Sequence, residues 1–259
     1  LGWFSCSGAY SYPHTTAVVV RGLLIAKRNG VAIPEDVIDR GVHWLKNYQE
    51  KEIDQLKRGD RMRKNPKLEL RDYKMSADNL DALVFQVLAE RNIQSETMRD
   101  YLFRDRLNLS VYAQAMYGLA LHQLKQIEKR DVAIKNISQY LVQDDENQTA
   151  YLKLGNENYW WCWYGSEIEA MAYYLKLLAA TDPKGEVAPK LVKYLLNNRK
   201  HSTYWNSTRD SALCVEAFAD YIAASGEDKP DITLEILIDG KKQKEVKIDQ
   251  SNLFTCDNT

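Results

Sequence analysis

The sequence repeats one pattern along most of its length, a pair of helical stretches. A stretch rich in Ala, Leu and Val follows a loop of small and aromatic residues, and a second helical stretch ends in an aromatic–Leu pair. The first stretches cover residues 15–24, 76–89, 110–121, 166–180 and 207–224. The second stretches end at Trp44-Leu45, Tyr101-Leu102, Tyr140-Leu141 and Tyr194-Leu195. Because helix pairs that recur at roughly 40–60 residues bury their apolar faces on one another, the pattern predicts a solenoid or a closed ring of helical hairpins.

The hydrophobic period changes from helical to alternating after Pro230. Apolar residues alternate along residues 232–238, and Asp239-Gly240 is typical of a tight turn between two antiparallel strands. We therefore expect a helical domain over residues 1–228, incomplete at its N-terminus, and the truncated start of a β-domain over residues 229–259.

The charges of the chain are balanced. It contains 35 Lys and Arg against 36 Asp and Glu, a formal net charge of -1. This balance argues against nucleic acid or an anionic membrane surface as the main partner. No run of about 20 apolar residues occurs, so no transmembrane segment is expected in this sequence.

The sequence lacks the common short motifs of catalysis and metal binding. Its four cysteines (Cys6, Cys162, Cys214 and Cys256) form no Cys-x-x-Cys pair, and we expect them to be mostly free and buried. A P-loop and the His-Glu-x-x-His and Gly-x-Ser-x-Gly motifs are also missing. We therefore predict no catalytic residue, no metal ligand and no cofactor, and we expect the four histidines to have structural roles.

Two polar segments interrupt the helical pattern. Residues 51–74 carry many charges, Gly59 and Pro66, and are expected to form an exposed insertion between helices after a helix that ends near residue 52. Residues 143–158 are expected to be irregular. They include Asp144-Asp145-Glu146, for which a solvated loop is the preferred interpretation over a Mg²⁺ site.

Aromatic residues gather in two loops that precede helices. Those loops contain Trp160, Trp161, Trp163 and Tyr164 in one, and Tyr204 and Trp205 in the other. They are the candidate binding residues of this sequence, since aromatic side chains at a helix entry can line a pocket. The alternative is that they close the end of the helical ring and pack against its inner helices.

The order of several segments resembles one protein family. Gly2-Trp3-Phe4, residues 12–20 and Gly41-Val42-His43-Trp44-Leu45 are similar to the thioester-containing domain of the alpha-2-macroglobulin and complement C3 family. Residues 167–175 resemble a late inner helix of that domain, and residues 205–213 resemble its Trp/Tyr-x-Ser-Thr-Gln-Asp segment, with Arg209 in place of the usual Gln. The resemblance covers nearly the whole chain and points to a bacterial member.

The resemblance implies a fold, a role and a location. The fold is an α/α toroid, the ring of helical hairpins also found in terpenoid cyclases and prenyltransferases, here with a C-terminal β-hairpin. The role is that of a non-enzymatic domain in an endopeptidase inhibitor that traps proteases. Its partners would be proteases, reached through the full-length protein, and other domains of the same chain, in a secreted, periplasmic or cell-envelope setting.

The sequence departs from the family in its chemistry. Thioester members carry a Cys-Gly-Glu-Gln segment, and no Cys-x-Glu-Gln occurs among these 259 residues. In the family that segment precedes Gly-Trp-Phe, so it is expected before Leu1 if the parent protein has one. The histidine that assists transfer in some complement members would fall within residues 51–74, which contain no His. Acyl transfer by this chain alone is therefore not expected.

Two alternatives from other classes remain open. One is an α/α-toroid enzyme of the terpenoid cyclase or polysaccharide-processing type, which an Asp-rich motif on an inner helix would favour. The other is an open helical-repeat scaffold that binds a protein surface, which a continuous concave groove would favour.

Overall fold

Nine helices and two strand pairs make up the described part of the computed structural model, which comprises residues 11–154, 166–227 and 229–252. The helices are α1 (Pro13–Arg28), α2 (Glu35–Lys64), α3 (Asn79–Ala89), α4 (Glu96–Arg104), α5 (Val111–Gln123), α6 (Ile127–Ser138), α7 (Glu167–Thr181), α8 (Val187–Asn197) and α9 (Thr208–Ser225). A short 3₁₀ turn spans Arg106–Asn108. The strands are β1 (Leu141–Asp144), β2 (Thr149–Leu152), β3 (Asp231–Ile238) and β4 (Lys241–Asp249).

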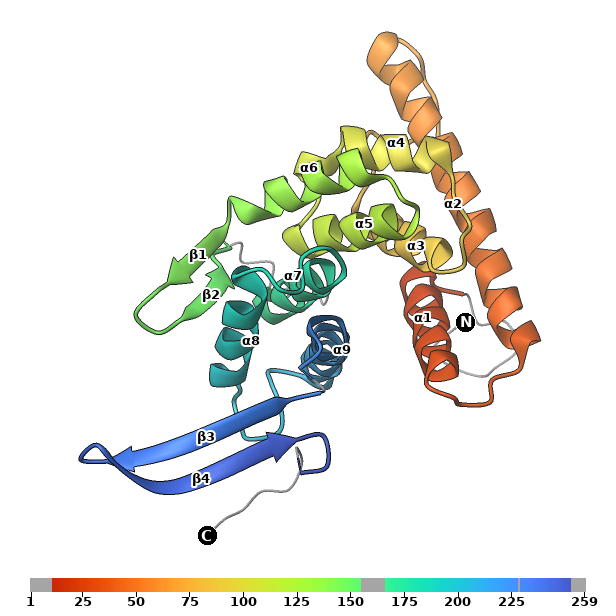
Figure 1. Ribbon diagram of the computed structural model, residues 1–259. Helices are drawn as coiled ribbons and strands as arrows, with labels where there is room; N and C mark the ends of the chain where they lie inside the picture. Colours follow the sequence, from red (N-terminus) through yellow and green to blue (C-terminus); the bar gives the residue numbers. More distant parts are fainter. Residues whose placement is uncertain (1–10, 155–165, 228, 253–259) are drawn as a thin grey trace.

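The odd-numbered helices form an inner set. Helix α1 contacts α3, α3 contacts α5, α5 contacts α7 and α7 contacts α9, while α2, α4, α6 and α8 lie on the outside (Figure 1). Arg21 of α1 forms an ion pair with Glu216 of α9, which links the last inner helix to the first. The structure thus has the mainly helical α/α ring and the C-terminal strand pair that the sequence predicts.

Polar caps fix where most inner helices begin. The side chains of Asp78, Ser110, Ser166 and Ser207 accept hydrogen bonds from backbone N–H groups in the first turns of α3, α5, α7 and α9. Such caps satisfy donors that a helix leaves unpaired at its start. An Asp or Ser before the apolar stretch is therefore the start signal of α3, α5, α7 and α9.

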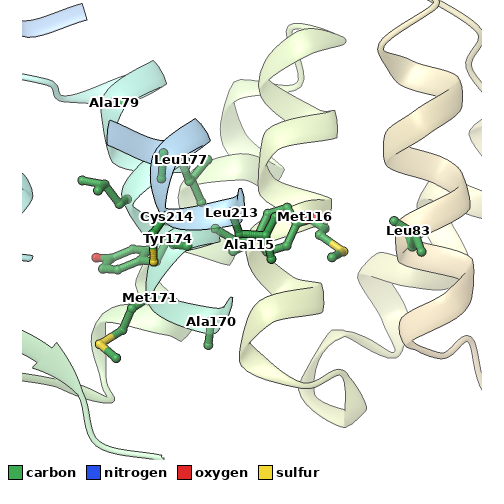
Figure 2. Close-up of a cluster of buried hydrophobic side chains, with 14 of the residues drawn as sticks. Leu83, Ala115, Met116, Ala170, Met171, Tyr174, Leu177, Ala179, Leu213 and Cys214 are labelled. Atoms are coloured by element: carbon green, nitrogen blue, oxygen red, sulfur yellow. The ribbon is translucent and has the colours of Figure 1, made fainter. Parts of the chain in front are cut away.

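The core lies between the inner helices. Helix α7 is buried on all sides from Ile168 to Ala179, as expected of a helix that has neighbours all round. Figure 2 shows Met116 of α5, Leu177 of α7 and Leu213 of α9 in one apolar cluster. At Gly118 of α5, an added Cβ would lie 2.8 Å from Cδ2 of Leu177, so the glycine allows α5 and α7 to approach closely.

Helix α2 is longer than the sequence predicts. It continues past residue 52 to Lys64, so the expected insertion is half helical, and its C-terminal end extends beyond α4 (Figure 1). The prediction was wrong because the extension is charged and shows little apolar periodicity. Contacts to α4 stabilise it instead: Asp60 accepts hydrogen bonds from Tyr101 Oη at 2.9 Å and from Arg104 Nη1 at 2.7 Å.

The chain then returns along α2. The backbone N–H of Lys74 donates to the carbonyl of Gln55 at 3.1 Å, and the Lys74 ammonium lies 2.8 Å from Glu52 and 2.6 Å from Asp81. The Lys74 carbonyl also packs against Gly59, where an added Cβ would lie 2.0 Å from that oxygen. The return segment is therefore fixed to α2 by charge pairing and by a close backbone approach.

The polar stretch after α6 contains a β-hairpin where the sequence predicts irregular structure. Strands β1 and β2 pair antiparallel, with Leu141 opposite Leu152 and Asp144 opposite Thr149. Ala150 and Leu152 are buried, and β2 packs against α8. Tertiary packing of these two apolar side chains supports the hairpin, which is why its mostly polar sequence gives little sign of it.

The C-terminal hairpin agrees with the alternating pattern. Strands β3 and β4 pair antiparallel around Asp239-Gly240, with Ile232 opposite Ile248. Every residue of β3 is exposed, including its Ile and Leu side chains. Isolated two-stranded hairpins have marginal stability in water.

Candidate functional site

The predicted aromatic site divides into residues with different surroundings. Trp160, Trp161, Trp163 and Tyr164 lie outside the described residues. Trp205 is 4% exposed, and its Nε1–H donates to the Leu195 carbonyl at 2.8 Å. Tyr204 is exposed and stacks on His201, with the ring centroids 4.4 Å apart. Of this pair, Trp205 joins α8 to α9, and Tyr204 presents aromatic surface to solvent.

The acidic segment Asp144-Asp145-Glu146 lies at the end of β1 and at the start of the turn to β2. Asp144 accepts hydrogen bonds from the backbone and side chain of Asn147, which lower the pKa of its carboxyl, and Asp145 pairs with Lys190 at 2.8 Å. A shallow polar hollow of about 430 Å³ lies beside this turn. Its lining residues are Asp144, Glu146, Asn147, Thr149, Lys193, Tyr194, Asn197 and Asn198. Among the described residues, no group of three or more His, Cys, Asp or Glu side chains could hold a metal ion.

A polar cluster lies where four inner helices begin, and we call His14, Tyr112, Glu169, Arg209 and Asp210 the entry cluster. Arg209 forms an ion pair with Glu169, and Ser166 Oγ donates to Asp210 at 2.6 Å, so the starts of α7 and α9 are side by side. The charge of Arg209 also acts on His14 in α1, and the charge of Glu169 acts on Tyr112 in α5.

Burial shifts the titration of the entry cluster. It raises the pKa of Glu169, although Arg209 partly offsets the effect. Burial and the nearby Arg209 lower the pKa of His14 to about 4, so the imidazole is neutral at neutral pH. The cluster therefore presents a buried carboxylate paired with a guanidinium, beside an uncharged imidazole.

The entry cluster gives a role to the residue that departs from the family pattern. Arg209 stands where the resembling segment has Gln, and in the structure it pairs with Glu169, whose side chain is 2% exposed. A buried carboxylate requires a compensating charge or hydrogen bonds. The guanidinium of Arg209 provides that charge, which a neutral amide would not.

A second set of charges connects the inner helices further along their length. This central cluster consists of Arg21, Glu90, Lys176, Glu216 and Asp220. Arg21 Nε lies 3.2 Å from Glu90, its Nη1 lies 3.0 Å from Glu216 Oε2, and Lys176 Nζ lies 2.7 Å from Glu216 Oε1. Helices α1, α7 and α9 and Glu90, which follows α3, are thus joined by one network.

Glu216 is the centre of that network. Burial would raise the pKa of its carboxyl, but Arg21 and Lys176 outweigh burial, and the pKa lies below its ordinary value. Arg21 also lies over the ring of buried Tyr173, with Cζ 5.7 Å from the centroid. A carboxylate held between two cations stays ionised, and it serves as an acceptor rather than as an acid at neutral pH.

Cys214 is the one described cysteine, and it is buried. Burial raises the pKa of its thiol to about 12, so the thiolate that would act as a nucleophile is not populated at neutral pH. Cys6, Cys162 and Cys256 lie outside the described residues.

Sequence reasoning missed the central cluster. A signal for it exists, because Lys176 is the only Lys or Arg in a helix that is otherwise mostly apolar, and Arg21 follows three consecutive valines. A charged residue within an apolar helix predicts a buried partner. The identity of the partner does not follow, since Arg21 and Glu216 are 195 positions apart.

Within the described part of the chain, no helix combines the length and the apolar character needed to cross a membrane.

Comparison with known proteins identifies an alpha-2-macroglobulin among the relatives of this chain. No family model matches the sequence. Alpha-2-macroglobulin of Thermotoga maritima is 24% identical over 222 residues, which cover 78% of this chain and 13% of the relative. The chain therefore spans about an eighth of the length of that curated relative.

Solved structures of bacterial alpha-2-macroglobulins share the fold. Salmonella alpha-2-macroglobulin reacted with methylamine matches 95% of this chain with a TM-score of 0.58 and 17% identity, over 15% of its own chain. Escherichia coli alpha-2-macroglobulin activated by porcine elastase matches 95% of this chain with a TM-score of 0.57 and 16% identity, over 20% of its own chain. The native Escherichia coli structure from domain MG7 to the C-terminus matches 93% of this chain, with a TM-score of 0.55 and 19% identity, over 34% of its own chain.

These matches confirm the resemblance that the sequence motifs indicate: over most of its length, this chain is similar in sequence and in fold to the alpha-2-macroglobulins of bacteria.

Proposed function

We propose that this chain is a non-enzymatic helical domain of an alpha-2-macroglobulin-like endopeptidase inhibitor, which traps proteases. The observation that carries the proposal is the match of the fold over 95% of the chain to bacterial alpha-2-macroglobulins, one of them in a form activated by elastase. Because the chain covers a small part of those proteins, protease capture belongs to the full-length protein, and this domain contributes a stable ring to it.

The charges inside the ring support a structural role. In the central cluster, Arg21 and Lys176 are paired with carboxylates, and in the entry cluster Arg209 is paired with Glu169. Catalytic carboxylates and nucleophiles act on a bound substrate and therefore need access to it. The paired groups at these two places join helices instead, and this favours the non-enzymatic role over a toroid enzyme.

We divide the chain into a toroid over residues 1–228 and the start of a β-domain over residues 229–259. The exposed apolar side chains of β3 support this division, because they require a cover that the helices do not provide. The expected partners of the helical domain are therefore other domains of the same protein, and we place that protein outside the cell or in the periplasm.

We propose that the aromatic helix-entry loops make the direct contacts of this domain with a neighbouring domain or ligand. Tyr204 is exposed at the end of the ring, which supports a role in binding a neighbouring domain or ligand. Trp205 supports that loop from within through its hydrogen bond to Leu195.

A protease trap should change the substrate range of its protease in a way that is not expected of an enzyme or a simple scaffold. The full-length protein that contains this chain is incubated with elastase, and the residual activity is measured on a large protein substrate and on a small peptide substrate. A protease enclosed by its inhibitor loses access to the large substrate but still cleaves the small one. Loss of both activities, or of neither, would contradict the trap.

A second measurement concerns the chemistry of the parent protein. The full-length protein is treated with methylamine, and released thiol and the mass shift are recorded. Thiol release with a matching mass shift assigns a thioester to a segment outside this sequence, which the ring would shield. Without release, trapping rests on conformational change alone.

A further inference from the structure

The balanced charge of the chain conceals a local excess of positive charge. We call residues 57–73, which form the end of α2 and the start of the return segment, the basic tip. It contains seven Lys or Arg residues and three Asp or Glu residues, a net charge of +4 in a chain whose net charge is -1. The argument from overall charge against an anionic partner therefore does not apply to this segment.

Four cations of the basic tip are exposed and have no ion-pair partner among the described residues: Arg61, Lys64, Lys67 and Arg71. The other basic residues of the tip are engaged within the fold. Arg58 donates to the Arg71 carbonyl at 3.3 Å, Arg63 donates to the Met75 carbonyl at 2.7 Å, and Lys57 lies 3.7 Å from Asp54. The structure thus holds four charges outward on a segment that other charges keep in place.

The shape of the basic tip is convex. The end of α2 extends beyond α4 and away from the inner helices (Figure 1). Leu68 is 37% exposed and Tyr73 is 45% exposed, so an aliphatic and an aromatic side chain stand among the cations. Cations mixed with exposed Leu and aromatic residues are typical of segments that lie at the surface of an anionic lipid layer.

We propose that the basic tip binds an anionic lipid surface. A planar layer of negative headgroups can meet all four outward cations of a convex tip at once, and Leu68 can enter the boundary between headgroups and acyl chains. An acidic protein would need a concave surface to do the same, and it would gain less from an exposed Leu. The rest of the chain, with a net charge of -5, would be turned away from the lipid.

The test uses the full chain with vesicles of phosphatidylcholine, with and without phosphatidylglycerol, in a sedimentation assay. We expect binding to the anionic vesicles only, and release of the protein at high salt because screening weakens exposed charges. The tip variant replaces Arg61, Lys64, Lys67 and Arg71 with Gln. Because each of the four Lys or Arg residues near an anionic surface contributes about 1 kcal/mol, we expect the partition of the variant to fall by about a thousandfold.

A matched control removes four exposed lysines from elsewhere on the chain. Those positions are Lys153, Lys184, Lys193 and Lys200, each replaced by Gln. Both variants have the same net charge, so the control should keep binding if the position of the charges matters. Circular dichroism and thermal unfolding of both variants check that they fold.

Leu68→Ala separates a lipid from an acidic polypeptide. It should weaken binding to anionic vesicles and leave binding to soluble polyglutamate unchanged. The proposal is overturned if the wild-type chain does not sediment with anionic vesicles at low salt, or if the tip and control variants lose binding equally. Tighter binding to polyglutamate than to vesicles, with no effect of Leu68→Ala, also overturns it and assigns the tip to an acidic protein.

Discussion

Arg21 and Glu216 are 195 positions apart in the chain, yet Arg21 Nη1 lies 3.0 Å from Glu216 Oε2, and a second contact joins the same two side chains. Arg21 belongs to the first inner helix and Glu216 to the last. Both side chains are largely buried, with 9% and 17% of their surface exposed. The ring is therefore joined at this point by charge rather than by apolar packing.

Replacing Arg21 with Met should destabilise the chain strongly. The change leaves Glu216 buried with Lys176 as its remaining cation, and loss of one partner of a buried pair costs about 3–5 kcal/mol. The free energy of unfolding in urea measures the effect. Arg40→Met is the control, because Arg40 pairs with Asp36 on the exposed surface of α2, where such a pair contributes about 0–1 kcal/mol. Equal effects of the two changes would show that the Arg21 pair does not support the ring.

Trp205 and Tyr204 should respond differently to truncation. Trp205→Ala removes a buried ring that packs against Phe218 and a hydrogen bond to Leu195, and it should cost about 3–5 kcal/mol of unfolding free energy. Tyr204→Ala removes an exposed side chain and should change stability by at most about 0.5 kcal/mol. Thermal unfolding of the two variants checks both values, and a stable Trp205→Ala variant would contradict the structural role of this residue.

Replacing Gly59 and Gly22 with Ala should change the stability of the chain in opposite directions. Gly59→Ala places a Cβ 2.0 Å from the Lys74 carbonyl oxygen and must displace the return segment, so it should destabilise the chain by about 1–3 kcal/mol. Gly22 lies inside α1 with nothing within 4 Å of an added Cβ, so Gly22→Ala should stabilise the chain by about 0.5–1 kcal/mol. Unfolding in denaturant tests both variants: the free energy of unfolding should fall for Gly59→Ala and rise for Gly22→Ala.

The stability of the chain should depend on pH through His14. Its pKa is about 4 in the folded protein against 6.5 for the ordinary value, so between these values the unfolded chain binds more protons. The contribution of His14 to the unfolding free energy is therefore fully present above pH 6.5 and is lost as the pH falls toward 4. Unfolding free energies across this window should fall less steeply for His14→Gln than for the wild type.

Glu169 pairs with Arg209, which also acts on His14, and its titration changes stability in the opposite direction. Burial raises the pKa of the Glu169 carboxyl, so above its ordinary pKa the folded protein binds more protons than the unfolded chain. The contribution of Glu169 to the unfolding free energy therefore decreases as the pH rises from the ordinary pKa of the carboxyl to its pKa in the folded protein. Glu169 is present in the wild type and in His14→Gln. The difference between the two proteins in how steeply the unfolding free energy changes with pH therefore reports the titration of His14. Parallel slopes would mean that His14 titrates normally.

The inner helices could be predicted from the sequence because local signals agree with the tertiary structure. Residues 166–180 form an apolar stretch that starts with a capping Ser, and the structure has α7 from Glu167 to Thr181. The same is true of α9, where Ser207 caps the helix. Hydrophobic content and a start signal are both encoded within the segment itself.

The end of α2 and the β1–β2 hairpin could not be predicted in this way. The end of α2 is charged, and it is stabilised by Asp60 contacts to Tyr101 and Arg104 of another helix. In the hairpin, Leu152 is buried because α8 and α7 lie against β2. In both places the stabilising partners are distant in sequence, as are those of the central cluster.

The inner helices also have a common direction, since the starts of α3 and α5 are joined by Asn79 and Ser110, and those of α7 and α9 by Ser166 and Asp210. Parallel helices add their macrodipoles, each worth about half a positive charge at the N-terminus. The first turns of α3, α7 and α9 carry Asp81, Glu169 and Asp210 at that end. The positive ends of the dipoles favour the ionised form of these carboxylates, and Lys74 and Arg209 pair with two of them, so the end of the ring where the helices begin holds charges of both signs.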